Sequence, residues 1–216
     1  MRTLVIDTAT AACSVALVED GLVVARIHEV LDRGHAERLV PMIAELPGGG
    51  RARRIAVDCG PGSFTGVRVG IAAARGLALG WDVPVHGFSS TALIAAAAFA
   101  AHPRPALAVV LEAGHGEVFM QSFAPTLETL APLASLKPEA AIAAIGGLPA
   151  VGNGVHRVLA LDPSVDAAPA LPDAADWRLL PAYLAALPPR PIYGRAPDAK
   201  PVPRGVEGLP QSAAVA

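Results

Sequence analysis

Two segments contain residue types that bind phosphate in other proteins, and each follows an expected strand. Asp7, Thr8 and Thr10 come directly after an apolar run, and residues 60–70 read GPGSFTGVRVG between a strand and a helix. Backbone amides at the start of a helix bind anions. Asp7, Thr8 and Thr10 could hold phosphate or a metal and are a candidate vestigial phosphate loop, although an Asp-Thr pair at a strand end is more typical of a capped turn.

The glycine-rich segment lacks the spacing of the known phosphate loops. A Walker loop requires a lysine that residues 60–70 do not contain, and the dinucleotide fingerprint has one residue fewer between its glycines. Glycine inside a helix costs about 1 kcal/mol relative to alanine, so we favour close packing over a phosphate cradle. The small residues recur every four positions and form one stripe on the helix expected from 63 to about 79: Gly66, Gly70, Ala74 and Ala78. The sequence leaves open whether the stripe packs within the chain or against another protein.

An amphipathic helix is expected at residues 35–46, where apolar residues follow the helical period: Leu39, Met42, Ile43 and Leu46. His35 begins this helix. The position four residues later holds Leu39 rather than a second histidine, so the helix has no pair of metal ligands.

The remaining candidates for chemistry are few. Cys13 and Cys59 have no zinc spacing, and the chain contains no G-x-S-x-G nucleophile elbow. Glu112 and His115 lie at an expected glycine turn, and we do not interpret them as a catalytic site. The sequence predicts no catalytic residue, no metal site and no cofactor.

Composition limits the class of protein. The chain has 216 residues, 53% of them hydrophobic, 17% charged and only 4% aromatic, with a formal net charge of −2. This composition excludes a disordered chain, and the charge provides no global positive field to attract nucleic acid. The start of the chain has no secretory pattern, and no apolar run is long enough to span a membrane, so we expect a cytoplasmic protein.

The order of elements predicts two α/β lobes, residues 1–103 and 104–216, joined at Pro103-Arg104-Pro105. In the first lobe we expect a three-stranded meander, the helix at 35–46, a strand at 55–57, the helix at 63–79, a strand at 83–85 and an alanine-rich helix that Ser89 caps. In the second we expect strands at 106–111 and 117–123, helices at 138–145 and from 155, and a Pro-rich end that contains one helix.

Six segments in the same order resemble the TsaB (YeaZ) family: LVIDTATAACSVAL, HAERLVPMI, DCGPGSFTGVRVGIAAARGLALG, EAGHGEVFM, GNG at 152–154 and YGRAPDAKP. The resemblance implies an α/β protein with the two-lobed actin-like ATPase superfold, in which ribonuclease H-like lobes repeat and the second is reduced. It also implies an accessory subunit that binds the TsaD transferase, with the TsaE ATPase as third member. This complex modifies tRNA to threonylcarbamoyladenosine beside the anticodon.

The resemblance further implies that the helices at 35–46 and 63–79 bind TsaD, or a second copy of the chain, in a four-helix bundle. The expected interface residues are Leu39, Met42, Ile43, Leu46, Phe64, Gly66, Val67, Gly70, Ile71 and Ala74. The family usually has an Asp-Ala-Arg pattern where this chain has Glu112 to Gly116, which leaves any inherited role of Glu112 and His115 in doubt. The alternatives are an ATP-binding or metallopeptidase-like enzyme and an independent homodimer.

Overall fold

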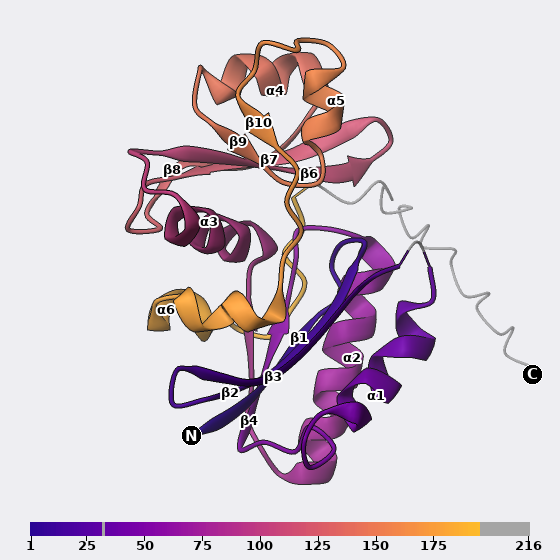
Figure 1. Ribbon diagram of the computed structural model, residues 1–216. Helices are drawn as coiled ribbons and strands as arrows, with labels where there is room; N and C mark the ends of the chain where they lie inside the picture. The colour runs from indigo at the N-terminus through magenta and orange to yellow at the C-terminus, as the bar shows by residue number, and fades with distance from the viewer. Residues whose placement is uncertain (32, 195–216) are drawn as a thin grey trace, which may run out of the picture.

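The computed structural model describes residues 1–31 and 33–194, so residues 195–216 of the expected Pro-rich end lie outside the described residues. Two five-stranded sheets lie one above the other, with helices between them and on both outer faces (Figure 1). Lobe 1 is the first sheet with its outer helices, and lobe 2 is the second sheet with its outer helices. No described helix has the length and apolar character that crossing a lipid bilayer requires.

Lobe 1 has the strand order β3-β2-β1-β4-β5. Its first three strands form an antiparallel meander, and β4 and β5 continue the sheet in parallel. The strands are β1 (Arg2–Asp7), β2 (Ala12–Glu19), β3 (Leu22–Val30), β4 (Arg54–Asp58) and β5 (Val85–Phe88). The outer helices are α1 (His35–Glu45) and α2 (Phe64–Trp81), which lie side by side on one face of the sheet (Figure 1).

Both faces of this sheet are buried at β1, β2 and β4, which explains the nearly continuous apolar runs of these strands, whereas the edge strand β3 is exposed or half-buried. Leu4 and Ile6 of β1 pack in one hydrophobic cluster with the inner sides of α1 and α2. Val5, between them, points to the opposite face and packs in a second cluster with the helices between the sheets. The alternation of side chains along a strand therefore divides β1 between two cores.

Lobe 2 repeats this strand order as β8-β7-β6-β9-β10, again with three antiparallel strands and two parallel ones. The strands are β6 (Leu107–Gly114), β7 (Glu117–Phe123), β8 (Thr129–Leu136), β9 (Ala150–Val151) and β10 (Ala167–Ala168). The outer helices are α4 (Pro138–Ile145) and α5 (Val155–Leu159). The parallel strands and the helices are shorter than their counterparts in lobe 1, so the prediction of a reduced second lobe is confirmed.

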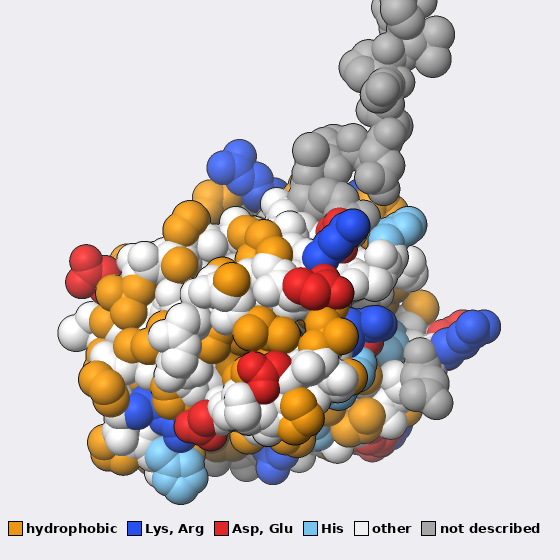
Figure 2. Space-filling model, turned by 90° about the horizontal axis from the view of Figure 1, so that it is seen from above, with side chains coloured by type: hydrophobic (Ala, Val, Ile, Leu, Met, Phe, Trp, Pro, Cys, Tyr) orange, Lys and Arg blue, Asp and Glu red, His pale blue; other side chains and the backbone are white. Residues whose placement is uncertain are grey.

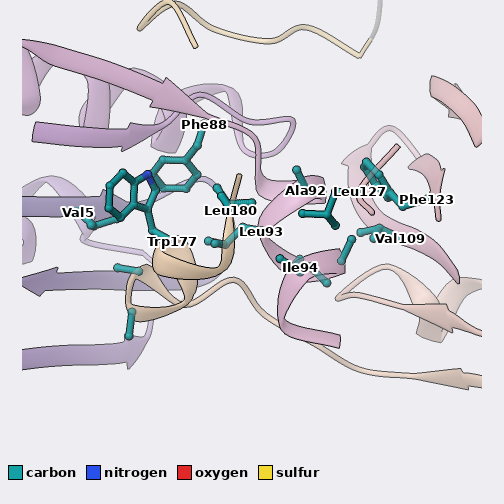
Figure 3. Packing of buried hydrophobic residues seen from close by; sticks show 14 of the residues in the cluster. Val5, Phe88, Ala92, Leu93, Ile94, Val109, Phe123, Leu127, Trp177 and Leu180 are labelled. Carbon is teal, nitrogen blue, oxygen red and sulfur yellow. The ribbon is translucent and has the colours of Figure 1, made fainter. Parts of the chain in front are cut away.

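A middle layer of three short helices joins the lobes: α3 (Ser90–Ala101), the 3-10 helix η1 (Ala174–Leu179) and α6 (Ala182–Ala185). Figure 3 shows Leu93 and Ile94 of α3 between Trp177 and Val5 on the lobe 1 side and Val109 and Phe123 on the lobe 2 side. A helix packed between two sheets must be apolar all round. This requirement explains the alanine-rich sequence of α3.

The end of the described chain returns from lobe 2 to lobe 1. Asp173 caps η1 by accepting a hydrogen bond from the Ala175 amide at 2.9 Å, and it forms an ion pair with Arg26 of β3. Gly87 and Leu187 then exchange backbone hydrogen bonds beside β5. The strands of the two sheets fall on either side of residue 103, whereas η1 and α6 lie in the helical layer between the sheets and contact both lobes.

Two expectations about local structure were wrong, and one strand was not expected. The sequence interpretation missed β8, an edge strand that contains Pro132 and is about half exposed, so it lacks the strong apolar signal of a buried strand. Ser89 precedes α3 as expected, yet its side chain caps no helix amide and lies 2.9 Å from the Thr91 hydroxyl instead. The strand expected at 83–85 lies at Val85–Phe88.

Candidate partner-binding helices and interlobe cleft

The candidate phosphate loop after β1 is closed by hydrogen bonds within the protein. The hydroxyl of Thr8 donates to the Gly66 carbonyl at 2.7 Å, and the hydroxyl of Thr10 accepts from the Ala12 amide at 3.1 Å. The Ser63 amide, at the start of α2, donates to the Ala9 carbonyl at 2.6 Å. The loop thus packs over the beginning of α2. The hydroxyl groups of Thr8 and Thr10, which were candidates for binding a ligand, form hydrogen bonds within the protein.

Asp7, the third member of that loop, is fully buried beside Asp58 at the end of the neighbouring strand β4. Burial raises the pKa of Asp7 well above its usual value, and the negative charge of Asp58 raises it further. Burial also raises the pKa of Asp58, although hydrogen bonds from Asp7, the Gly60 amide and Ser90 lower it in part. These directions are those of a protonated Asp7 that donates a hydrogen bond to the Asp58 carboxylate.

The small-residue stripe of α2 packs inside the chain against the end of β1. A Cβ atom at Gly66 would lie 2.0 Å from the backbone oxygen of Thr8, and one at Gly70 would lie 2.6 Å from the Thr8 hydroxyl oxygen. The preference for packing over a phosphate cradle is confirmed at these two glycines. The packed neighbour is a strand end of lobe 1 rather than another helix.

Most of the expected interface residues face the core of lobe 1 in the isolated chain. Phe64 is exposed, but all the others are buried: Leu39, Met42, Ile43, Leu46, Gly66, Val67, Gly70, Ile71 and Ala74. An apolar stripe on a surface helix faces either its own core or a partner, and the sequence pattern is the same in both cases. In this chain the stripe on each helix faces the core.

The outer face of the same two helices carries exposed apolar side chains beside the charged side chains of Glu37, Glu45 and Arg75. Val40 on α1 is 56% exposed, and Phe64 and Leu79 near the two ends of α2 are 68% and 87% exposed. The exposed positions between them include small residues that keep the surface shallow: Ala36, Ala44, Ala72, Gly76 and Gly80. Such a surface over two adjacent helices is suited to close helix packing by another protein.

An aromatic and cationic cluster lies at the start of α2. The guanidinium of Arg68 lies 3.2 Å from the ring centroid of Phe64 and donates a hydrogen bond to the Tyr193 hydroxyl at 2.7 Å. Arg75, two turns further on, donates to the Pro189 carbonyl at 2.7 Å. Through these contacts, the C-terminal part of the described chain borders the outer face of α2.

A cavity of about 500 Å³ lies between the lobes, beside the starts of α1 and α2. Thr10, His35 and Ser63 contribute to it from lobe 1, and Glu112 and Asn153 from lobe 2. The Nε2 atom of His35 is buried without a hydrogen-bond partner among the described residues. Leu39, one turn later, is directed into the core, so α1 brings only one imidazole to this cleft.

Glu112 has a role that the sequence interpretation did not assign. Its carboxylate lies 2.9 Å from Arg157 Nη2 and 3.3 Å from His156 Nε2, and its amide donates to the Asn153 side chain at 3.1 Å. These contacts join the end of β6 to α5. The GNG segment at 152–154 is the sequence feature that could have indicated this contact. Its first glycine packs closely on β6, because a Cβ atom at Gly152 would lie 2.1 Å from the Val110 backbone oxygen. His115 is exposed at the tip of the β6–β7 turn.

The two sheets have the same strand order and pack on a common layer of helices. This arrangement defines a two-lobed, actin-like α/β protein with ribonuclease H-like lobes. A family model described as TsaD, tRNA N6-adenosine threonylcarbamoyltransferase, matches residues 27–152. The chain is also similar to the YeaZ structure from Pseudomonas aeruginosa, with a TM-score of 0.73, 30% identity and coverage of 89% of this chain and 99% of that one.

Sequence comparison agrees with the structural likeness. The chain is 41% identical to the tRNA threonylcarbamoyladenosine biosynthesis protein TsaB of Escherichia coli, over 57% of this chain and 55% of that protein. It is 41% identical to TsaB of Haemophilus influenzae, over 54% and 51%. The chain thus matches about half the length of these curated relatives. An uncharacterized protein of Mycobacterium tuberculosis is 34% identical over 92% of this chain and 94% of its own. The chain belongs to the TsaB (YeaZ) family.

Proposed function

We propose that this protein is a noncatalytic subunit that binds and activates a TsaD-type transferase in the formation of threonylcarbamoyladenosine beside the tRNA anticodon. The observation that carries the proposal is the exposed apolar face of α1 and α2, which has Val40, Phe64 and Leu79 on it. A TsaE-type ATPase and the tRNA join through the assembled complex, which works in the cytoplasm. This proposal retains the predicted pair of helices and replaces their inner residues with their outer ones.

The partner and this chain are related in fold, which supports a contact between equivalent helices. The family model that matches residues 27–152 is that of the transferase, and this range contains both α1 and α2. Two related subunits can bury their helix pairs against one another in a four-helix bundle. A stable interface of this kind buries roughly 1,600 Å² in total. Without the transferase, the same face would pair with a second copy of the chain.

The polar groups near the cleft support a noncatalytic role. Thr8 and Thr10 make turn and cap hydrogen bonds, and Asp7 is buried against Asp58. Among residues 1–31 and 33–194, no three His, Cys, Asp or Glu side chains come together in a way that could hold a metal ion. The side chains that ATP hydrolysis or metal-dependent proteolysis would use are therefore committed to the fold or separated from one another.

The proposal is tested by reconstituting tRNA modification from purified components with and without this chain. We expect incorporation of threonine into tRNA to require this chain together with the transferase, and we expect this chain alone to produce none. Undiminished modification in its absence would contradict the activating role. Hydrolysis of ATP or of a peptide by this chain alone would contradict the noncatalytic role and favour the enzyme alternative.

A further inference from the structure

A second cavity, of about 430 Å³, lies in lobe 2 away from the proposed partner-binding face. Three segments line it: the β6–β7 turn with His115, the start of α4 with Lys137 and Glu139, and α5 with His156 and Arg157. Figure 2 looks onto the α4 and α5 end of the molecule, where basic, acidic and histidine side chains lie close together on one side. The cavity thus gathers side chains that are distant in sequence.

Lys137 supplies a positive charge that no described carboxylate pairs with, and Arg157 adds a second, which Glu112 partly neutralises. Lys137 and His115 form no ion pair within the described part of the chain. Arg157 and His156 share a single carboxylate, that of Glu112, and the other ring nitrogen of His156 lies 2.9 Å from the Asn153 carbonyl oxygen. Glu139 is the one acidic residue in the lining, and it is exposed.

The backbone at the start of α4 adds donors to the same cavity. The helix begins at Pro138, which has no amide hydrogen, so the amides of Glu139 and Ala140 are the first donors, and no side chain caps this first turn. The first amides of a helix have no partner within the helix and carry its positive dipole end, so uncapped amides attract anions. A lysine ammonium, an arginine guanidinium and an uncapped helix start are each common ligands of phosphate.

The geometry points to a binding site for a phosphate group, and we assign it to a backbone phosphate of the tRNA substrate. The volume exceeds that of a free phosphate ion and accommodates a phosphate with its ribose. The formal charge of the chain is −2, so its surface as a whole does not attract RNA. Binding of RNA by this chain therefore needs a local site. This assignment rests on the proposed function, whereas the phosphate chemistry of the cavity does not.

The first experiment titrates the isolated chain with inorganic phosphate and follows its backbone amide signals by NMR. We expect saturable shifts around Gly116, Glu139 and Arg157, at least a threefold loss of affinity in Lys137→Gln, and a gain of similar size in Glu139→Gln, which removes the repelling charge. Both substitutions spare the helix because neither side chain caps it. Shifts that do not saturate, or that are the same in Lys137→Gln, would overturn the site.

The second experiment measures tRNA binding by the assembled complex over a range of salt concentrations. For the Lys137→Gln/Arg157→Gln double variant, we expect affinity to fall about tenfold and the slope of log K against log salt to decrease by about 1 to 2. Arg53→Gln/Arg51→Gln is the matched control, because it removes two exposed arginines of lobe 1. Phosphate binding with unchanged tRNA affinity would overturn the RNA assignment and indicate a small phosphorylated ligand.

The two proposals fail in different ways. Sizing of the complex reports on partner binding, which the substitutions around this cavity should leave unchanged. If the chain and transferase do not associate, the proposed function fails, while the phosphate titration of the isolated chain still decides the site.

Discussion

Lobe 1 and lobe 2 share one strand order but differ in what covers their sheets. In lobe 1 the parallel strands β4 and β5 have five and four residues, and the outer helices have eleven and eighteen. In lobe 2 the parallel strands have two residues each, and the outer helices have eight and five. The longer helices of lobe 1 fill its core with one face and leave a second apolar face exposed, which a partner can bury.

The strand ends of the two lobes differ in the same way as their helices: the acidic side chains are buried in lobe 1 and partly exposed in lobe 2. In lobe 1, β1 and β4 end in the buried carboxyl groups of Asp7 and Asp58. In lobe 2, the corresponding β6 carries Glu112, whose carboxylate is 42% exposed and pairs with Arg157 and His156. The comparison indicates that the strand ends of lobe 1 are closely packed around two buried carboxyl groups, and that the strand end of lobe 2 is held by a surface ion pair.

The largest effect is expected where α2 touches β1. Gly66→Ala should lower the free energy of unfolding by about 3 kcal/mol or more, because the added methyl group overlaps the Thr8 backbone oxygen, which cannot move freely. Gly76→Ala is the matched control on the same helix, since nothing lies within 4 Å of its Cβ position. It should stabilise the chain by up to about 1 kcal/mol. Urea denaturation measures both, and equal effects would contradict the packing of the stripe.

An intermediate effect, dependent on pH, is expected at the Asp7–Asp58 pair. Because the pKa of Asp7 is raised in the folded chain, the stability that the pair contributes is present below about pH 4 and is lost as the pH rises through the folded-state pKa. Asp7→Asn supplies a donor that does not ionise. We expect it to be the more stable protein at high pH and to approach the wild type in acid.

Thermal denaturation at several pH values measures this difference. Arg38 lowers the pKa values of Glu29 and Glu45, so their contribution to stability is lost as the pH falls. This contribution is the same in both proteins and cancels in the comparison. Parallel stability curves for the wild type and Asp7→Asn would show that no shared proton links the strand ends.

The smallest effect is expected at the ion pair of lobe 2. Glu112→Gln should change the free energy of unfolding by less than about 1 kcal/mol, because partly exposed ion pairs are screened by water and salt. Urea denaturation at low and high salt measures the difference. A loss comparable to that of Gly66→Ala would remove the distinction drawn between the two lobes.

The sequence was sufficient to predict elements with a strong period and insufficient to assign their faces. The helix at 35–46 and the glycine stripe from Gly66 were recognisable because apolar and small residues recur at helical spacing. The same spacing does not say whether Leu39 or Gly70 meets a core or a partner, since both surfaces are apolar. The contacts of Asp173 and of Glu112 join segments far apart in the chain, and local pattern holds no information about such pairs.

The most direct test of the central claim is light scattering of this chain mixed with its cognate TsaD-type transferase. Ala72→Arg places a long charged side chain on the exposed outer face of α2, and Ala144→Arg makes the same change on exposed α4 in lobe 2. We predict that wild type and Ala144→Arg form the heterodimer, whereas Ala72→Arg stays folded and unbound. A heterodimer formed equally well by Ala72→Arg would contradict binding through the outer face of lobe 1.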